Sequence, residues 1–244
     1  MKSFVSLWTI CASFTPVSLA TTATESPHVL AVNELQTTIT KAITGFEATQ
    51  LRQWSFQVER YENEEGEVTS SIERFSPQQE LSQQWQLIEI NKRMPTADEQ
   101  DDFQRRKQDA EVNISLRLSE LIQTDSLAVV SEDSAYISAS FNVYLKRLGA
   151  DASKHLQGTL TFAKHGEFIE HIEITNTDSF SPMFAATIDT LSLNMAFVKI
   201  DQAILTQRID LKMQGSFALF TEIDEVSSDV FSDYQYIGPC TFNC

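Results

Sequence analysis

The sequence predicts an α+β protein that is mostly β, with a single large antiparallel sheet and helices on one face. Two observations lead to this fold class. Eight or more short segments alternate apolar with polar residues, the pattern of strands that bury one face. Only two segments, near residues 27–46 and 96–108, have helical features. Strands that outnumber helices and follow one another at short spacing favour an antiparallel sheet over alternating βαβ units.

The first twenty residues have the order of a secretory signal peptide. Lys2 supplies a positive start, an apolar run covers residues 4–14, and small residues precede an expected cleavage after Ala20. The run is too short to cross a bilayer as a mature helix. Cys11 does not fit a lipid-attachment site, because residues 8–10 are Trp, Thr and Ile. We expect an exported protein, in the periplasm first and secreted as the second choice, and not an integral membrane protein.

Composition narrows the choice of partners. The chain carries 18 basic and 34 acidic residues, so its net charge is −16 and would become −17 once Lys2 is removed with the leader. Such a surface repels nucleic acid and anionic lipid headgroups. Apolar residues make up 42% of the chain, enough for a sizeable core. We therefore expect no nucleic-acid function. Two interpretations agree with the acidic composition: the surface keeps the protein soluble, or it binds a basic partner.

The N-terminal part predicts one helix followed by three strands. Ser26-Pro27 is a helix start, and apolar residues then recur at helical spacing to about Gly45 or slightly beyond. Residues 54–58 alternate as a half-buried strand, and the sequence NEEG, which ends at Gly66, predicts a turn. The second strand is expected to carry Val68, Ile72 and Phe75, and the third contains Trp85, Leu87, Ile88 and Ile90.

The stretch NKRMPTADEQDDFQRRKQD, residues 91–109, is the most distinctive part of the sequence. Thr96 followed by Glu99 forms a capping box, which predicts a polar helix at about 96–108. Acidic residues fill its first turns and basic residues its last, in line with the helix dipole. With only Met94 and Phe103 apolar, the helix should be mostly solvated. Helix-start chemistry explains the spacing, and recognition by a partner stays open as the alternative.

The remainder is predicted to be long strands in one domain. Residues 111–127 have no clear assignment; SELIQTDS fits a short helix or a turn. Strands follow around residues 136–145, in a hairpin about His165-Gly166, and around 188–197 and 204–217, with a last short strand in VFSDYQYIG. We expect a single β-rich domain over residues 21–244 with a tail at 238–244; a division near residue 110 is the alternative.

Motifs of catalysis and metal binding are missing from the sequence. It has no HExxH, C-x2-C, G-x-S-x-G, P-loop or G-x-G-x-x-G pattern. His165 and His171 should not converge, because residue 171 pairs near residue 160 if Gly166 marks the turn. Cys240 and Cys244 at the end of the chain predict a disulfide in an oxidising compartment, with a metal or redox pair as the rival. We expect no enzyme activity, no cofactor and no metal.

The positive feature is aromatic mass at inward strand positions. Two interpretations need the same alternation: an ordinary packed core, or a curved sheet that leaves an apolar cavity for a ligand. The residues expected to line such a cavity are Trp54, Phe56, Trp85, Phe141, Phe162, Phe197 and Phe217.

The order of elements resembles the periplasmic lipoprotein-carrier proteins and their uncharacterised bacterial relatives. The resemblance rests on ERFSP at Glu73–Pro77, WQLIEINKRMPTADE at Trp85–Glu99 and FSDYQ at Phe231–Gln235. It implies a sheet curled into an unclosed half-barrel, with the N-terminal and mid-chain helices over its mouth, that shelters acyl chains without a covalent step. No catalytic or binding residue of a carrier is transferred to this chain.

Together these expectations describe a non-enzymatic periplasmic protein that binds a lipid or acylated ligand, or an envelope protein partner. The alternative is a structural or assembly protein of the envelope with a filled core and no ligand.

Overall fold

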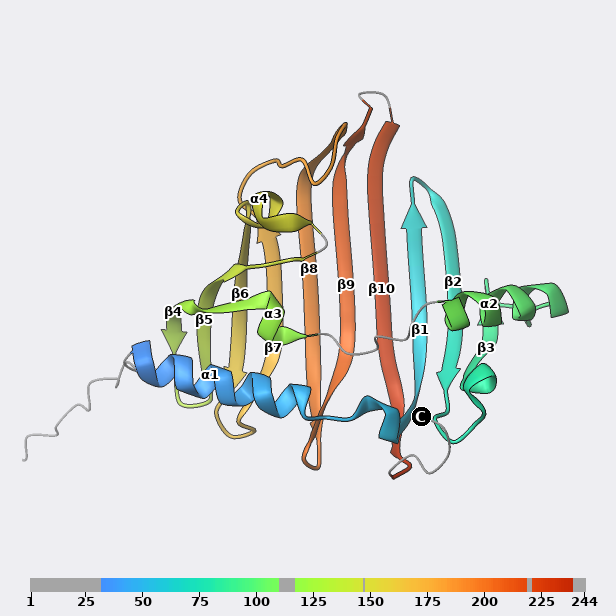
Figure 1. The fold of residues 1–244 in the computed structure, drawn as a ribbon, viewed down its shortest axis with the longest axis horizontal. Helices are drawn as coiled ribbons and strands as arrows, with labels where there is room; N and C mark the ends of the chain where they lie inside the picture. The colour runs from blue at the N-terminus through green and yellow to red at the C-terminus, as the bar shows by residue number, and fades with distance from the viewer. Residues whose placement is uncertain (1–31, 110–116, 147, 219–220, 239–244) are drawn as a thin grey trace, which may run out of the picture.

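The computed structural model describes residues 32–109, 117–146, 148–218 and 221–238. It contains one ten-stranded antiparallel sheet, in the order β3-β2-β1-β10-β9-β8-β7-β6-β5-β4 (Figure 1). The strands are β1 (Trp54–Glu64), β2 (Glu67–Phe75), β3 (Trp85–Ile90), β4 (Ile122–Glu132), β5 (Tyr136–Val143), β6 (Leu156–Ala163), β7 (Phe168–Asn176), β8 (Ala186–Ile200), β9 (Ala203–Phe217) and β10 (Thr221–Tyr236). The helices are α1 (Val32–Glu47), η1 (Leu51–Gln53), η2 (Leu81–Gln83), α2 (Ala97–Asp109), α3 (Leu118–Leu121) and α4 (Gly149–Ser153).

The sheet is built from two meanders. Strands β4 to β10 are neighbours in chain order, and β1 to β3 form a second, shorter meander. The last strand, β10, lies beside the first, β1, and joins the two meanders. β3 and β4 are the two edges of the sheet, so the predicted unclosed, mostly β architecture is confirmed.

Tight turns set the register of the first meander. Glu64 pairs with Glu67, and Glu65 and Gly66 between them have φ values of 52° and 91°. Two consecutive positive φ angles are those of a type I′ turn, whose twist matches that of the flanking strands. The amide of Gly66 also donates to the side-chain oxygen of Asn63 over 3.0 Å. The predicted turn at NEEG is therefore confirmed.

Two helices cover opposite ends of the same face of the sheet, which we call the helix-bearing face (Figure 1). α1 packs against β4, β7 and β9, and its buried side chains are Leu35, Ile39, Ala42 and Ile43. These α1 side chains belong to the larger of two apolar clusters, which extends across β4 to β9. The expected helix start at Ser26-Pro27 lies outside the described residues.

A smaller cluster lies under α2 at the other end of the sheet. It consists of Phe56, Val58, Phe75, Trp85, Leu87 and Phe103. Among the α2 side chains that the structure describes, Phe103 is the buried one. The predicted polar helix at about 96–108 agrees with α2, and its largely solvated surface is confirmed.

Several sequence-based predictions need correction. The unassigned stretch before residue 127 contains α3 and the first half of the edge strand β4, whose polar residues hide the alternation. The last strand is not short, since β10 has 16 residues. Phe217 does not face inward: it lies at the end of β9 and is 44% exposed. In β2, Phe75 is buried as expected but Val68 is 52% exposed.

A close approach between two strands generates a first testable prediction. Gly158 on β6 pairs with Phe141 on β5, and a Cβ built on Gly158 would lie 2.2 Å from the Cζ atom of the Phe141 ring. Because this ring is 2% exposed it cannot move aside freely. Gly158→Ala should lower the free energy of unfolding in urea by about 1–3 kcal/mol. The double variant F141L/G158A should recover part of the loss; equal stability of wild type and Gly158→Ala would contradict this packing.

Candidate functional site

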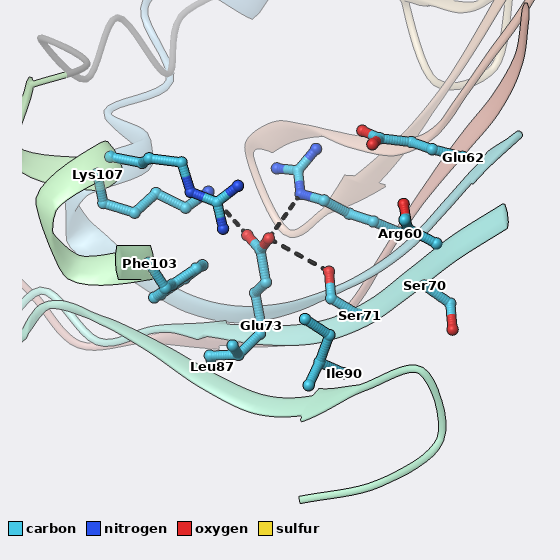
Figure 2. A pocket seen from close by; sticks show the side chains of 11 residues that line it. Arg60, Glu62, Ser70, Ser71, Glu73, Leu87, Ile90, Phe103 and Lys107 are labelled. Carbon is cyan, nitrogen blue, oxygen red and sulfur yellow. Dashed lines mark hydrogen bonds and ion pairs between the residues drawn. The ribbon is translucent and has the colours of Figure 1, made fainter. Parts of the chain in front are cut away.

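The candidate site is a pocket between α2 and strands β1 to β3. Its volume is about 510 Å³ (Figure 2). One part of the wall is apolar, with Leu87, Ile90 and Phe103. The rest is charged or hydroxylated and is formed by Arg60, Glu62, Thr69, Ser70, Ser71, Glu73, Arg106 and Lys107. A wall of this mixed kind suits a ligand with both apolar and polar parts.

Glu73 is the buried charge at the centre of the pocket wall, with 5% of the residue exposed. Its Oε1 lies 3.1 Å from Nε of Arg60, and its Oε2 lies 2.8 Å from Nζ of Lys107. The Ser71 hydroxyl donates to Oε1 over a longer 3.4 Å. Figure 2 shows the three side chains converging on this carboxylate. Burial of a carboxylate is tolerated here because both of its oxygens have cationic partners.

Strand register brings these charges together. Glu73 on β2 lies opposite Val58 on β1, and directly paired residues point to the same face. Two pairs further along, and so on the same face, Arg60 lies opposite Ser71 on β2 and opposite Asp229 on β10. Arg60 makes a second ion pair through Nη1 with Oδ2 of Asp229. The guanidinium therefore links residues from all three strands.

Lys107 brings α2 into this network. Besides its ion pair with Glu73, its Nζ lies 4.2 Å from the centroid of the Trp85 ring and 5.2 Å from that of Phe103. An ammonium over an aromatic face is attracted by the ring quadrupole. The last turn of α2 is thus held to the sheet by the ion pair with Glu73 and by the Trp85 ring, while the Phe103 contact lies within the helix.

Burial and charge act in opposition on the pKa values of the network. Burial is the largest effect on Lys107 and its pKa is lowered, although the neighbouring Glu73 acts to raise it. Burial is also the largest effect on Asp229 and its pKa is raised, although Arg60 acts to lower it. Burial lowers the pKa of Arg60, but Glu73 and Asp229 together raise it above its ordinary value. Each charge in the set faces an opposite one, so the arrangement suits fixed positioning and recognition better than proton transfer.

Half-buried aliphatic residues lie on the helix-bearing face beyond the polar side of the pocket. Leu193 on β8 pairs with Leu211 on β9, Leu211 pairs with Ser227 on β10, and Ser227 pairs with Glu62 on β1. Both leucines are half-buried, whereas Glu62 is exposed and lines the pocket. The neighbouring Ile209, Met213 and Ile223 are also half-buried and pack against the larger cluster. An aliphatic strip therefore runs up to the polar side of the pocket.

The residues predicted to line an apolar cavity do not share one. Trp54, Phe56 and Trp85 lie at one end of the sheet, where the Phe56 ring centroid is 5.2 Å from Phe75 and 5.8 Å from Trp85. The other residues of the set belong elsewhere: Phe141, Phe162 and Phe197 to the larger cluster, and Phe217 to the exposed end of β9. Six of the seven are buried in contact with other core groups.

One of these residues does line a pocket. Trp54 and Tyr236, whose ring centroids are 5.3 Å apart, contribute to a second pocket of about 430 Å³ at the end of α1. This pocket is separate from the one around Glu73.

Sequence reasoning missed the charged residues of the site. Glu73 stands two positions before Phe75, so both side chains share one face of β2, and this spacing was the available signal. Arg60 likewise stands two positions after Val58, so both side chains lie on one face of β1. The contribution of Asp229 had no local signal, because it depends on the pairing of β1 with β10.

The distinctive stretch at residues 91–109 forms a tight turn and a capped helix. Asn91 and Lys92 have positive φ values of 47° and 61° between Ile90 and Arg93, which exchange backbone hydrogen bonds. The capping box is confirmed: the Thr96 amide donates to Glu99 Oε2 over 2.8 Å, and the Glu99 amide donates to Thr96 Oγ1 over 3.3 Å. Arg93 braces the cap by donating to both oxygens of the Glu99 carboxylate.

Other predicted features have simple outcomes. His171 pairs with Thr161, so it stays apart from His165 as predicted. Among the described residues no group of three or more His, Cys, Asp or Glu could hold a metal ion, and no helix is long and apolar enough to cross a membrane. The expected cleavage after Ala20 and the Cys240–Cys244 disulfide lie outside the described residues.

Comparisons with known proteins do not assign the chain to a family. No protein-family model matches the chain, and no curated protein matches it, so the resemblance to lipoprotein carriers has no support at the level of sequence families. Among solved structures, a DUF1329 family protein from Desulfovibrio piger is similar over 84% of this chain and 92% of its own. The identity is 9% and the TM-score 0.33, too low to carry an argument about function.

The buried carboxylate gives a second testable prediction. Glu73→Gln keeps the shape of the side chain but leaves Lys107 without its acidic partner and Arg60 with Asp229 alone. Loss of one member of a buried ion pair should lower the free energy of unfolding by about 3 kcal/mol. Asp102→Asn is the control, since it removes an exposed pair with Arg105 on the same helix and should change stability by about 0.5 kcal/mol at most. Equal effects of the two variants would contradict a structural role for burial at Glu73.

The helix cap gives a prediction of pH dependence. The Arg93 guanidinium and then the Thr96 amide lower the pKa of Glu99 to about 2. Because the folded-state pKa is depressed, the cap is fully stabilising above the ordinary value near 4.5 and is lost as the pH falls toward 2. Amide chemical shifts of the first turn of α2 should follow this loss. In Glu99→Gln the step should vanish; an unchanged step in the variant would assign it to another group.

Proposed function

We propose that the protein is an exported, non-enzymatic binding protein that holds an amphiphilic ligand, an acyl chain with a polar end, on the helix-bearing face. The observation that carries the proposal is the pocket of about 510 Å³ whose wall changes from apolar to charged within one cavity. The half-buried leucines on β8 and β9 lie beyond the polar side of this pocket, past Ser227 and Glu62, and provide a second apolar surface on the same face. The comparisons with known proteins supply no argument for ligand binding or for the absence of a cofactor.

The apolar part supplies the affinity in this proposal. Each methylene withdrawn from water contributes about 0.8 kcal/mol, so an acyl chain laid along Leu193 and Leu211 is held without a covalent step. The polar end of the ligand then faces the part of the wall that contains Thr69 and Arg60, where hydroxyl and guanidinium groups supply hydrogen-bond donors. The charged side chains of the wall are held in place by their own ion pairs. They therefore present a fixed pattern of charge, which orients the ligand.

Export rests on the N-terminal sequence. A short basic start, an apolar run and small residues before Ala20 are the features of a secretory leader. We propose the periplasm of a Gram-negative bacterium as the location, where a water-soluble holder for acyl chains has a physical use.

A structural or assembly protein without a ligand is the second candidate, and one observation favours it. The large rings pack against one another, as Phe46 does with Phe197 at 5.0 Å and Phe56 with Phe75 at 5.2 Å. A sheet whose aromatic residues are already satisfied has less need of a ligand, and its acidic surface would then contact a partner in the envelope.

A fluorescent acyl probe distinguishes the two candidates. Dansylated undecanoic acid should gain fluorescence with the wild-type protein, and Leu211→Gln should weaken its binding about tenfold, because a polar amide replaces an apolar wall. Lys212→Gln is the matched control: it introduces the same side chain next in sequence, on the opposite face of β9. This control should bind the probe as the wild type does.

Competition by unlabelled fatty acids tests the physical basis of the same binding. Two further methylenes should strengthen competition roughly 15-fold, at about 0.8 kcal/mol each. Absence of any fluorescence gain with the wild type, or equal loss in the Leu211→Gln and Lys212→Gln proteins, would refute acyl binding on this face and leave the ligand-free candidate.

A further inference from the structure

The edge strand β3 presents backbone groups that would ordinarily pair with another strand. Exposed sheet edges are sites of unwanted association, and proteins cover or blunt them. β3 pairs with β2 on one side, and no strand of the described residues lies on its other side. α2 contacts β3 and, in the view of Figure 1, runs across this end of the sheet and extends past the β3 edge.

Two glutamines of α2 donate hydrogen bonds to the free edge. Nε2 of Gln104 lies 2.5 Å from the carbonyl oxygen of Trp85, and Nε2 of Gln100 lies 2.6 Å from that of Leu87. Gln100 and Gln104 lie about one helical turn apart on the same side of α2, and Trp85 and Leu87 are two residues apart on β3. The amides thus bind successive carbonyls that point to the same side of β3.

The remaining contacts of α2 also fix its place at this edge. Phe103, between the two glutamines in sequence, is 2% exposed and fills the space beside Trp85 and Leu87 in the smaller cluster. Lys107 then anchors the last turn through Glu73. The glutamines, the phenylalanine and the lysine recur at three- and four-residue spacing on one side of an otherwise polar helix.

We propose that α2 guards the sheet edge: Gln100 and Gln104 take the place of the N–H donors of an eleventh strand, and β3 pairs with β3 of a second copy once they are lost. A second copy is the expected occupant because an antiparallel edge is complementary to itself under a twofold rotation. In β3, buried Trp85 and Leu87 alternate with exposed Gln86 and Ile88. The same alternation would continue in the β3 strand of the second copy.

The test replaces both donors by methionine, which keeps length and helix propensity but cannot donate. In Q100M/Q104M at low protein concentration, the β3 amides that bond to β2 should exchange with solvent roughly 30-fold faster, because the loss of two hydrogen bonds to β3 carbonyls makes local opening of the strand easier. Sedimentation velocity at rising concentration should show a dimer that the wild type does not form, in which the β3 amides that face the free edge become protected from exchange.

The matched control is D101M/R105M. It has the same number of methionines at the same four-residue spacing, and it leaves the net charge unchanged, but both positions are exposed. This control should stay monomeric with wild-type exchange in β3. Exchange in β6, far from α2, shows that each variant has folded, and Q104M alone serves as the test protein if the double variant does not fold.

Three results would overturn the proposal. They are wild-type exchange in β3 of the folded glutamine variant, a monomer at all concentrations, and a dimer that forms equally in the control or without protection of β3.

Discussion

The pairing of β1 with β10 is the constraint on which the rest of the structure depends. It runs from Trp54 opposite Tyr236 to Glu64 opposite Glu225, with one irregularity near Ser55, and joins a strand early in the chain to the last one. Without it the two meanders would be separate small sheets, each with an additional edge to protect. With it, Arg60 meets Asp229, and the aromatic ring of Phe56 lies 6.0 Å from that of Phe231.

This joint also explains why the helix-bearing face has two covered ends. α1 buries the face of β4 to β9, and α2 buries that of β1 to β3, so each meander has one principal helix. Between them the side chains of β9 and β10 are mostly half-buried, as Leu211 and Ser227 are. The pocket around Glu73 opens at this boundary, where an apolar surface gives way to a charged one. The proposed ligand lies where the fold has least of its own material to cover the sheet.

The sequence predicted local structure well and long-range structure poorly. The Glu65-Gly66 turn and the Thr96–Glu99 cap depend on neighbouring residues, so their patterns could be read directly. The pairing of β1 with β10 spans most of the chain and leaves no local pattern. β4 was missed because polar residues such as Gln123, Thr124 and Asp125 interrupt its alternation. The site was missed for a related reason: a charged residue at an inward position, such as Glu73, resembles a break in a strand until its partners on other elements are known.

Native mass spectrometry of protein released by osmotic shock from the cells that produce it tests the central claim most directly. If the helix-bearing face holds an acyl ligand, the released protein should carry extra mass, and activation in the gas phase should remove it as a species with a hydrocarbon chain. A single mass equal to that of the processed polypeptide, unchanged after incubation with fatty acid, would contradict the account.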